Sequence, residues 1–326
     1  MVTADQIFSI TDGKQFGKLA LKAFRLHHAE NSVYRKFCDH LSIDPGQVKS
    51  VADIPFLPIQ FFKTENIILR GLTPETIFTS SGTTGTTTSR HLVADTGLYR
   101  ESFRRGFARF YGDICNYCVL ALLPSYLERQ GSSLVTMADD MIAKSGNPES
   151  GFHLHDLDRL ADKLLRLDAE GQNILLLGVT YGLLDLAEKR DFKLSNTIVM
   201  ETGGMKGQRR ELVREELHDI LKTGFGVSQI HSEYGMTELL SQAYSLGNGR
   251  FECPPWMQVM ARDPEDALSP IAYGRNGGLN IIDLANIHSC PFIATQDLGR
   301  CHSDGTFEVL GRFDHADIRG CNLMAL

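Results

Sequence analysis

The chain has 326 residues, of which 42% are hydrophobic and 22% are charged, and its formal net charge at pH 7 is −7. This length and composition fit a globular protein with one large domain or two moderate ones. The negative charge argues against nucleic acid as the main partner, because that binding depends on many Lys and Arg contacts to phosphates.

Neither a transmembrane segment nor disulfide bonds are expected. No apolar run approaches the ~20 residues needed to span a bilayer, and residues 1–5 lack the basic and then apolar layout of a signal peptide. We therefore expect a cytoplasmic protein without a transmembrane segment. Its seven cysteines are then expected to be thiols, and the lone pair Cys115 and Cys118 has no second pair at metal spacing.

The first part of the chain reads as helices and then an apolar segment. Residues 1–50 carry apolar side chains at three- and four-residue steps, which predicts helices. Residues 54–63 contain two prolines, so we expect an apolar loop packed on the core there. A strand is predicted at 76–78 and an amphipathic helix at 96–111.

Between that strand and that helix, nine of the twelve residues 79–90 carry a hydroxyl. Its glycines let a ligand approach closely, and backbone N–H groups and hydroxyls suit an anion such as a phosphate chain. The alternative is a mobile Ser/Thr/Gly linker. A Walker loop is excluded because only two residues separate the glycines. The phosphate-binding candidates are Thr79, Ser80, Ser81, Gly82, Thr83, Thr84, Gly85 and Arg90.

Strands and helices then alternate. Strands are predicted at 117–123, 173–179, 197–201 and 227–231, and helices at 134–143, 154–168, 181–189 and 208–222, the first capped by Ser132 or Ser133. This order predicts an α/β fold with a parallel or mixed sheet covered by helices on both faces. Ligands of such sheets bind outside the carboxyl ends of strands. We place the hydroxyl-rich loop and segments 178–181 and 202–204 at that edge.

The last part of the chain reads as strands. Runs such as 278–283 and 305–310 alternate with Pro, Gly and Asn turns, which predicts a small β subdomain. The sequence thus predicts an N-terminal helical segment at 1–50, an α/β core at 51–248, and a β subdomain with a truncated hinge at 249–326.

Five motifs resemble, in order, those of the AMP-forming superfamily of acyl-CoA ligases, luciferases and adenylation domains. They are the hydroxyl-rich loop at 79–85, the Thr-Gly-Gly turn at 202–204, the Tyr-Gly-x-Thr-Glu motif at 234–238, and the segments 295–300 and 311–314. Together they are specific, although each alone is weak or moderate. The resemblance implies the adenylate-forming fold over residues 50–320.

Within this superfamily the chain is most similar to the LuxE-like acyl-protein synthetases. The shared features are the short chain, the segment 54–58, the double serine before Gly82, and the ending Arg319-Gly320-Cys321. This resemblance implies activation of a fatty or other carboxylic acid with ATP. The acyl group is then carried on Cys321 and passed to a partner protein such as a reductase or acyl carrier.

The resemblance also implies a role for each motif residue. Glu238 is expected to hold Mg²⁺ and Thr237 to bind the α-phosphate. The turn residues Gly203 and Gly204, with Tyr234, Gly235 and Met236, are expected around adenine, Asp297 on the ribose hydroxyls, and Arg312 on ribose or phosphate. Thr180, Tyr181 and His231 are expected to line the acyl pocket. The structural alternatives are a surface salt bridge for Glu238, a core position for Tyr234, a buried ion pair for Asp297 and Arg312, and hinge packing for Cys321.

Two departures from the superfamily leave other functions open. Thr88-Ser89-Arg90 stands where the superfamily continues with Pro-Lys, and the chain ends at Leu326, just past the hinge. The mobile C-terminal domain with its adenylation lysine is therefore expected to be absent. The alternatives are an acyl- or aryl-CoA ligase of the same fold and a non-catalytic module that binds a nucleotide or acyl group.

Overall fold

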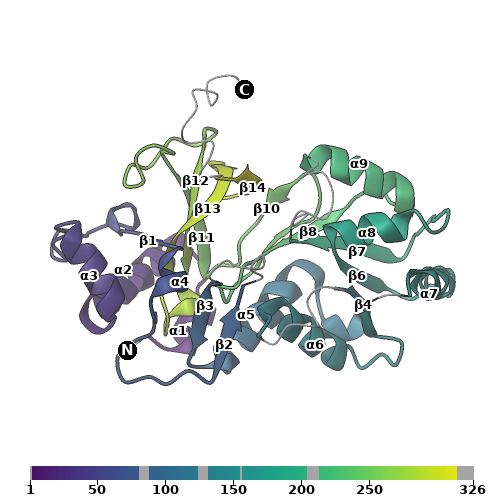
Figure 1. Cartoon of the computed structure of the whole chain (residues 1–326), viewed down its shortest axis with the longest axis horizontal. Coiled ribbons are helices and arrows are strands. Elements are labelled where there is room, and N and C mark those ends of the chain that lie inside the picture. The colour runs from purple at the N-terminus through teal and green to yellow at the C-terminus, as the bar shows by residue number, and fades with distance from the viewer. Residues whose placement is uncertain (1, 81–87, 124–130, 155, 204–212, 314–326) are drawn as a thin grey trace. The chain divides into compact units, whose positions relative to one another are not determined.

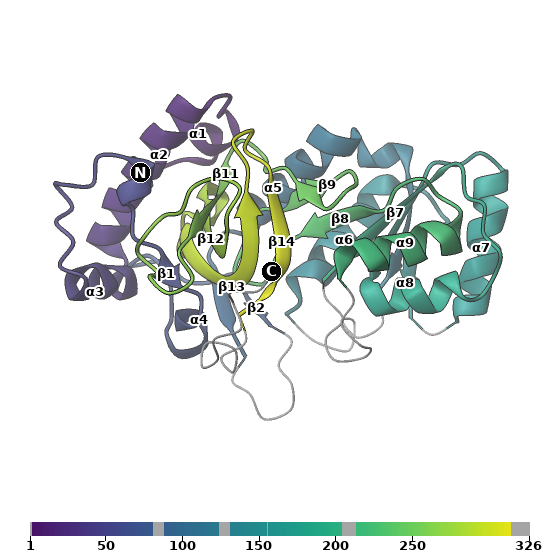
Figure 2. The same ribbon diagram turned by 90° about the horizontal axis from the view of Figure 1, so that it is seen from above.

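The computed structural model describes residues 2–80, 88–123, 131–154, 156–203 and 213–313, drawn in Figures 1 and 2. The chain packs as two compact units. The central unit spans 72–254, and the terminal unit joins 1–71 with 255–326. Both ends of the chain thus belong to one unit, while the three-segment division remains a prediction. None of the described helices is long and apolar enough to cross a membrane.

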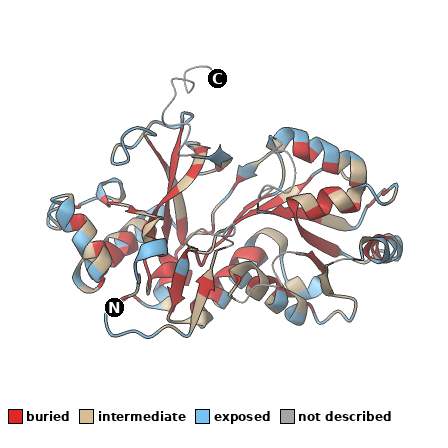
Figure 3. Ribbon diagram, in the orientation of Figure 1, coloured by how far each residue is buried: buried red, intermediate tan, exposed pale blue. Residues whose placement is uncertain are grey.

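The central unit is built on a six-stranded sheet in the order β5-β4-β6-β7-β8-β9. Its strands are β4 (Cys118–Leu122), β5 (Gly151–His153), β6 (Ile174–Val179), β7 (Thr197–Thr202), β8 (His231–Tyr234) and β9 (Ala243–Ser245). All neighbouring pairs are parallel except β8 and β9. Every residue of β4 and β6 is buried, as expected for parallel strands covered on both faces (Figure 3). The mixed α/β sheet is confirmed.

Helices cover both faces of this sheet. On one face lie α7 (Leu157–Ala169), α8 (Thr180–Ala187) and α9 (Arg214–Phe225), which share an apolar core with β4, β6 and β7. On the other face lie α5 (Thr96–Tyr111) and α6 (Ser133–Ser145), with the short helix η2 (Ile114–Asn116) (Figure 1). Asp95 caps α5, and the Ser132 hydroxyl accepts the Val135 N–H at 3.3 Å, which confirms the predicted cap of α6.

The hydroxyl-rich loop does not follow a strand of this sheet, contrary to the prediction. It joins β2 (Thr76–Thr79) and β3 (Arg90–Val93), an antiparallel hairpin that forms its own two-stranded sheet. The prediction missed β3, whose last three residues are buried. The short β10 (Arg250–Phe251) ends the central unit.

The strand predicted at 227–231 was misplaced. Helix α9 ends at Phe225 and is capped by Gly226, which adopts φ 65°, and the Val227 N–H still bonds the Lys222 carbonyl at 3.2 Å. Strand β8 begins only at His231 and carries Ser232 and Glu233 in its middle, both buried. Polar residues in a buried strand do not follow the hydrophobic pattern from which the strand was predicted.

The terminal unit packs the first helices on an antiparallel sheet. The helices are α1 (Ala4–Phe8), α2 (Gly13–Glu30), α3 (Ser32–His40), η1 (Val51–Asp53) and α4 (Phe61–Thr64), with η3 (Leu284–Asn286) near the sheet. The strands are β11 (Met257–Arg262), β12 (Asn276–Asp283), β13 (Phe292–Cys301) and β14 (Phe307–Arg312). His27 in α2 donates through Nε2 to the Ile287 carbonyl at 2.9 Å, which ties α2 to the end of η3, between β12 and β13.

The apolar segment at 54–63 is more regular than predicted. It contains β1 (Leu57–Pro58), which pairs in parallel with β13, and then α4. Pro58 is tolerated because β1 pairs with a single strand at the sheet edge. Leu57 and Phe62 are fully buried, so the predicted packing on the core is correct.

Candidate functional site

The segments that follow β6 and β7 start beside each other at the carboxyl edge of the central sheet, as predicted. Val179, the last residue of β6, pairs with Thr202, the last residue of β7, so the segments that follow start side by side. The buried Thr180 hydroxyl donates to the Gly203 carbonyl at 2.9 Å. Gly203 adopts φ 70°, which favours glycine, and it is exposed. Its backbone is therefore open to a ligand at the edge where such sheets bind them.

The Tyr-Gly-Met-Thr-Glu motif continues from the next strand at the same edge. Tyr234 is the last residue of β8, and its ring lies edge-on against Phe251 at 5.9 Å. Gly235 is exposed, Met236 and Thr237 are half-buried, and Glu238 is buried. The Leu239 N–H bonds the Met236 carbonyl at 3.1 Å and closes a turn that presents the motif.

The hairpin holds the base of the hydroxyl-rich loop beside this motif. Thr79 and the exposed Arg90 are paired at the end of the hairpin, and the Ser80 N–H bonds the Ser89 carbonyl at 3.1 Å. His91, buried one residue further on, donates through Nδ1 to the Thr237 carbonyl at 2.8 Å. The sequence did not reveal His91, since its role depends on this contact over 146 positions.

Glu233 is a second residue that sequence reasoning missed. It is buried on β8, accepts a short hydrogen bond from the Thr202 hydroxyl, and is paired with no cation among the described residues. Burial raises the pKa of the Glu233 carboxyl to about 7, against the lowering effect of the Thr202 hydrogen bond, and the Glu201 charge adds to the rise. A carboxyl group with this pKa changes its charge in the physiological range.

Glu201, one residue before Thr202, is also a buried carboxyl group, but its charge is compensated by a cation. Its carboxylate pairs with Arg214 of α9 and lies 3.7 Å from His218 Nε2. Arg214 Nη1 also donates to Ser232 Oγ at 3.2 Å. Burial raises the pKa of Glu201, but Arg214, His218 and Ser232 outweigh it and hold the pKa below its usual value. Glu201 therefore stays ionised and ties α9 to the ends of β7 and β8.

The terminal unit carries the remaining predicted nucleotide contacts. Asp297 on β13 pairs with Arg312 on β14, with 3.0 Å between Oδ1 and Nε. The Arg312 side chain is 70% exposed and that of Asp297 is 9% exposed. The Asp297 N–H bonds the Thr295 hydroxyl at 3.1 Å, which fixes the backbone at this position.

Buried Arg262 supports this part of the sheet. It donates to the Leu279 carbonyl and to Asn280 Oδ1 at 2.8 and 2.9 Å, and to the Thr295 carbonyl at 2.6 Å. Burial lowers the pKa of Arg262 to about 10, partly offset by the Asp297 charge. A Cβ at residue 278 would lie 2.6 Å from its Cζ, so glycine there makes room for the guanidinium group.

The predicted acyl-pocket residues lie on two elements. Thr180 and the half-buried Tyr181 begin α8, while His231 begins β8 and its Nδ1 is 3.2 Å from the Tyr111 hydroxyl. Burial lowers the pKa of His231. The candidates Ser81, Gly82, Thr83, Thr84, Gly85, Gly204 and Cys321 lie outside the described residues.

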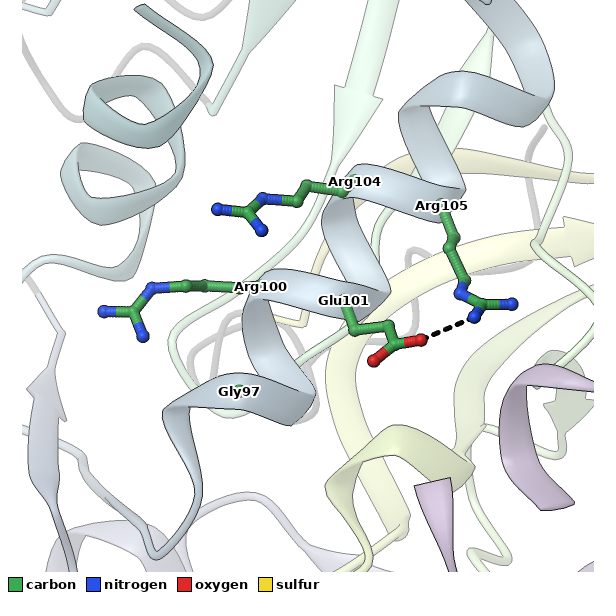
Figure 4. Close-up of a pocket in the computed structure, with 5 residues that line it drawn as sticks. All are labelled: Gly97, Arg100, Glu101, Arg104 and Arg105. Carbon is green, nitrogen blue, oxygen red and sulfur yellow. Dashed lines mark ion pairs between the residues drawn. The ribbon is translucent and has the colours of Figure 1, made fainter. Parts of the chain in front are cut away.

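A hollow of about 430 Å³ lies along α5, away from the predicted residues. It is lined by Gly97, Arg100, Glu101, Arg104 and Arg105 (Figure 4). Arg105 pairs with Glu101 at 2.6 Å and Arg104 with Asp140 at 2.5 Å. Two of its three arginines are therefore neutralised, and the hollow does not replace the edge of the sheet as the candidate site.

Comparison with known proteins identifies the family. The model of the family described as "Acyl-protein synthetase, LuxE" matches residues 8–105 and 146–325. The chain belongs to this family. The long-chain-fatty-acid–luciferin-component ligase of Vibrio harveyi is 24% identical over 356 residues, covering 98% of this chain and 89% of that protein. The ligase of the same name from Aliivibrio fischeri is 24% identical over 361 residues, covering 99% and 91%.

Solved structures show the same fold. A 2-hydroxyisobutyryl-CoA ligase in an open conformation has a TM-score of 0.69 at 13% identity, over 93% of this chain and 70% of that one. ATP-bound MatB from Rhodopseudomonas palustris has a TM-score of 0.55 at 18% identity, over 72% and 47%. The fold is thus that of adenylate-forming ligases, and this LuxE family member is a ligase that activates an acyl group with ATP.

We expect Glu233 to make folding stability depend on pH. Its usual pKa is 4.5 and its folded pKa is about 7, so the unfolded chain releases this proton first as pH rises. Stability from this group is therefore full below pH 4.5, falls towards pH 7, and is flat above. Relative to wild type, Glu233→Gln should gain about 2.5 kcal/mol between pH 5 and pH 8, at about 1.4 kcal/mol per pKa unit. Urea unfolding at each pH measures this, and a constant difference between the two proteins would contradict the raised pKa.

Proposed function

We propose that this LuxE family member converts a long-chain fatty acid to its acyl-adenylate and then transfers the acyl group to its own Cys321. One observation supports the formation of the acyl-adenylate. The Thr202–Gly203 turn, the Tyr234–Glu238 motif and the base of the hydroxyl-rich loop are joined by hydrogen bonds within one unit. The substrate class is inferred from the two relatives named as long-chain-fatty-acid ligases.

The nucleotide contacts are proposed by motif. Backbone N–H groups and hydroxyls of residues 79–85, with Arg90, bind the phosphates, because oriented donors and a guanidinium group suit an anion. Thr237 binds the α-phosphate through its hydroxyl. The residues Gly203, Gly204, Gly235 and Met236 take adenine together with the Tyr234 ring, with Gly203 and Gly235 exposed. Asp297 accepts the ribose hydroxyls and Arg312 contacts ribose or phosphate.

The residues present fit Mg²⁺. Among the described residues no cluster of three or more His, Cys, Asp or Glu could hold a metal by itself. Mg²⁺ is commonly held by one or two carboxylates together with substrate phosphates, and Glu238 supplies a buried carboxylate in the motif. When bound, Mg²⁺ would neutralise charge on the phosphates.

Adenylation joins two anions, so the protein must align them. A carboxylate oxygen of the fatty acid attacks the α-phosphorus, the new P–O bond forms, and pyrophosphate leaves. Thr237 and the hydroxyl-rich loop hold the phosphates in line and offset charge as the bond to pyrophosphate breaks. Thr180, Tyr181 and His231 are proposed to line the space for the acyl chain.

The second half transfers the acyl group to sulfur. The Cys321 thiolate attacks the acyl carbonyl carbon, a thioester forms, and AMP leaves with the electrons of the C–O bond. Arg319, two residues away, favours the thiolate, which is the nucleophile. The thioester keeps the acyl group activated for transfer to an acyl-accepting protein such as a reductase or an acyl carrier.

Cys321→Ser tests the acceptor. The wild-type protein with ATP, Mg²⁺ and a labelled long-chain fatty acid should form a hydroxylamine-sensitive adduct mapped to Cys321 by mass spectrometry. The variant should lose the adduct and keep acid-dependent ATP–pyrophosphate exchange, while Cys115→Ser, at an exposed thiol, should behave as wild type. Label on another cysteine, or free acyl-CoA without self-labelling, would sink the acyl-protein assignment.

Glu238→Gln tests the metal site. The amide keeps the volume but loses the charge that Mg²⁺ requires, so exchange should fall by several kcal/mol in transition-state stabilisation. Exchange is measured across Mg²⁺ concentrations, with Glu252→Gln, at an exposed position of the same unit, as control. Wild-type exchange by Glu238→Gln at every Mg²⁺ concentration would exclude the role.

Asp297→Asn tests the ribose contact. Charged hydrogen bonds contribute about 1.5–3 kcal/mol each, so ATP affinity should fall at least tenfold in calorimetry. Glu308→Gln is the matched control, because Glu308 on β14 is likewise a carboxylate in an ion pair, with His302 at 2.6 Å. If Asp297→Asn instead lowers the melting temperature and leaves ATP affinity unchanged, Asp297 serves only the fold.

A further inference from the structure

Glu233 stands in a row of side chains that crosses three strands. Its register partners are Thr202 on the parallel strand β7 and Tyr244 on the antiparallel strand β9. Residues paired across a sheet share one face, with Cβ atoms about 5 Å apart. The Thr202 hydroxyl completes the link by donating to Glu233 Oε2. One oxygen of Glu233 therefore holds the residue that precedes the Gly203 turn.

The other oxygen of Glu233 lies under the motif loop. A Cβ at residue 235 would lie 2.5 Å from Glu233 Oε1, which is closer than real Cβ contacts come. The same Cβ would lie 3.5 Å from the Gln242 side chain, so the backbone of Gly235 rests on both residues. Glycine at 235 allows the carboxyl group of Glu233 to touch the motif from below while the opposite side of Gly235 stays exposed.

We propose that Glu233 is a positioning residue that fastens the Thr202–Gly203 turn to the Tyr234–Glu238 motif in the nucleotide site. Its two oxygens contact the two segments. This inference rests on the proposed adenylation reaction. Glu233 acts through the two loops and touches neither substrate.

The surroundings of Glu233 favour its neutral form. Tyr99 and Tyr111 of α5 and Tyr244 of β9 have their pKa values raised by burial and further by the Glu233 charge, so all three remain neutral phenols. His231 on the same strand has a pKa lowered by burial, and the charge of Glu201 on β7 repels a second carboxylate. None of these groups offsets a negative charge on Glu233.

The Thr202 hydroxyl can donate to either form of Glu233, but the contact with Gly235 is a packed one, and an ionised Glu233 is a buried charge without a cation among the described residues. Such a charge attracts water and strains the packing around it. As pH rises past 7, the two loops should separate and the site should bind ATP less well. Glutamine matches the shape of neutral glutamic acid and cannot ionise, so Glu233→Gln should keep the loops joined at every pH.

The test measures KM for ATP in acid-dependent pyrophosphate exchange at saturating Mg²⁺, at pH 6 and at pH 8. The wild-type KM should rise by about tenfold as the packing beneath Gly235 loosens, which corresponds to ~1.4 kcal/mol. Glu233→Gln should keep the low KM at both pH values. Glu233→Ala should have the raised KM at both. Circular dichroism confirms that each variant is folded.

Asp168→Asn is the matched control. Asp168 is buried in the same unit at the opposite end of β7, where it accepts hydrogen bonds from Ser195 N, Asn196 N and Thr197 Oγ1. This variant should lower the melting temperature and leave the pH dependence of KM as in wild type. A purely structural role for Glu233 would give the same result in Glu233→Gln.

Equal KM values for wild type and Glu233→Gln at both pH values overturn the pH dependence, and a wild-type KM in folded Glu233→Ala overturns the positioning role. Absence of exchange in the wild type with any acid is a different result, because it removes the proposed function. In that case, ATP affinity from calorimetry on the same variants at the same two pH values still decides whether Glu233 positions the loops.

Discussion

The parallel register of β6, β7 and β8 is the constraint on which the candidate site depends. Val179 pairs with Thr202 and Thr202 with Glu233, so the three strands end at one edge. Each following segment then starts beside the next, and short hydrogen-bonded links suffice to hold them.

The same register places the carboxyl groups of Glu201 and Glu233 in the interior. Their surroundings differ between the two faces of the sheet. On the α9 face Arg214 compensates Glu201, which stays charged. On the α5 face Glu233 has tyrosines and a threonine hydroxyl for neighbours. An uncompensated buried charge costs several kcal/mol. Keeping Glu233 protonated up to neutral pH costs less free energy than burying its charge. A charged carboxylate, Glu201, and a carboxyl group that keeps its proton, Glu233, therefore lie on opposite faces of adjoining strands.

Most of the fold could be predicted because its signals are local. The continuous apolar runs of β4 and β6, the capped starts of α5 and α6, and the order of strands and helices were all legible in sequence. Strand β8 was not, since His231, Ser232 and Glu233 read as polar, and only their partners across the sheet explain their burial. The motif residues were found through a family resemblance, whereas His91 and Glu233 contact residues distant in sequence and carry no motif.

The bond between His91 and Thr237 explains why the hairpin belongs to the site although it lies outside the six-stranded sheet. His91 is fully buried, so its Nδ1–H needs a partner, and the Thr237 carbonyl satisfies it. With that carbonyl hydrogen-bonded, the backbone of Thr237 is fixed. This holds the Thr237 hydroxyl in place for its proposed contact with the α-phosphate. Arg90 and the base of the hydroxyl-rich loop are adjacent in sequence to His91. One hydrogen bond thus keeps the base of the hydroxyl-rich loop beside the Tyr-Gly-Met-Thr-Glu turn, as the proposed site for a triphosphate requires.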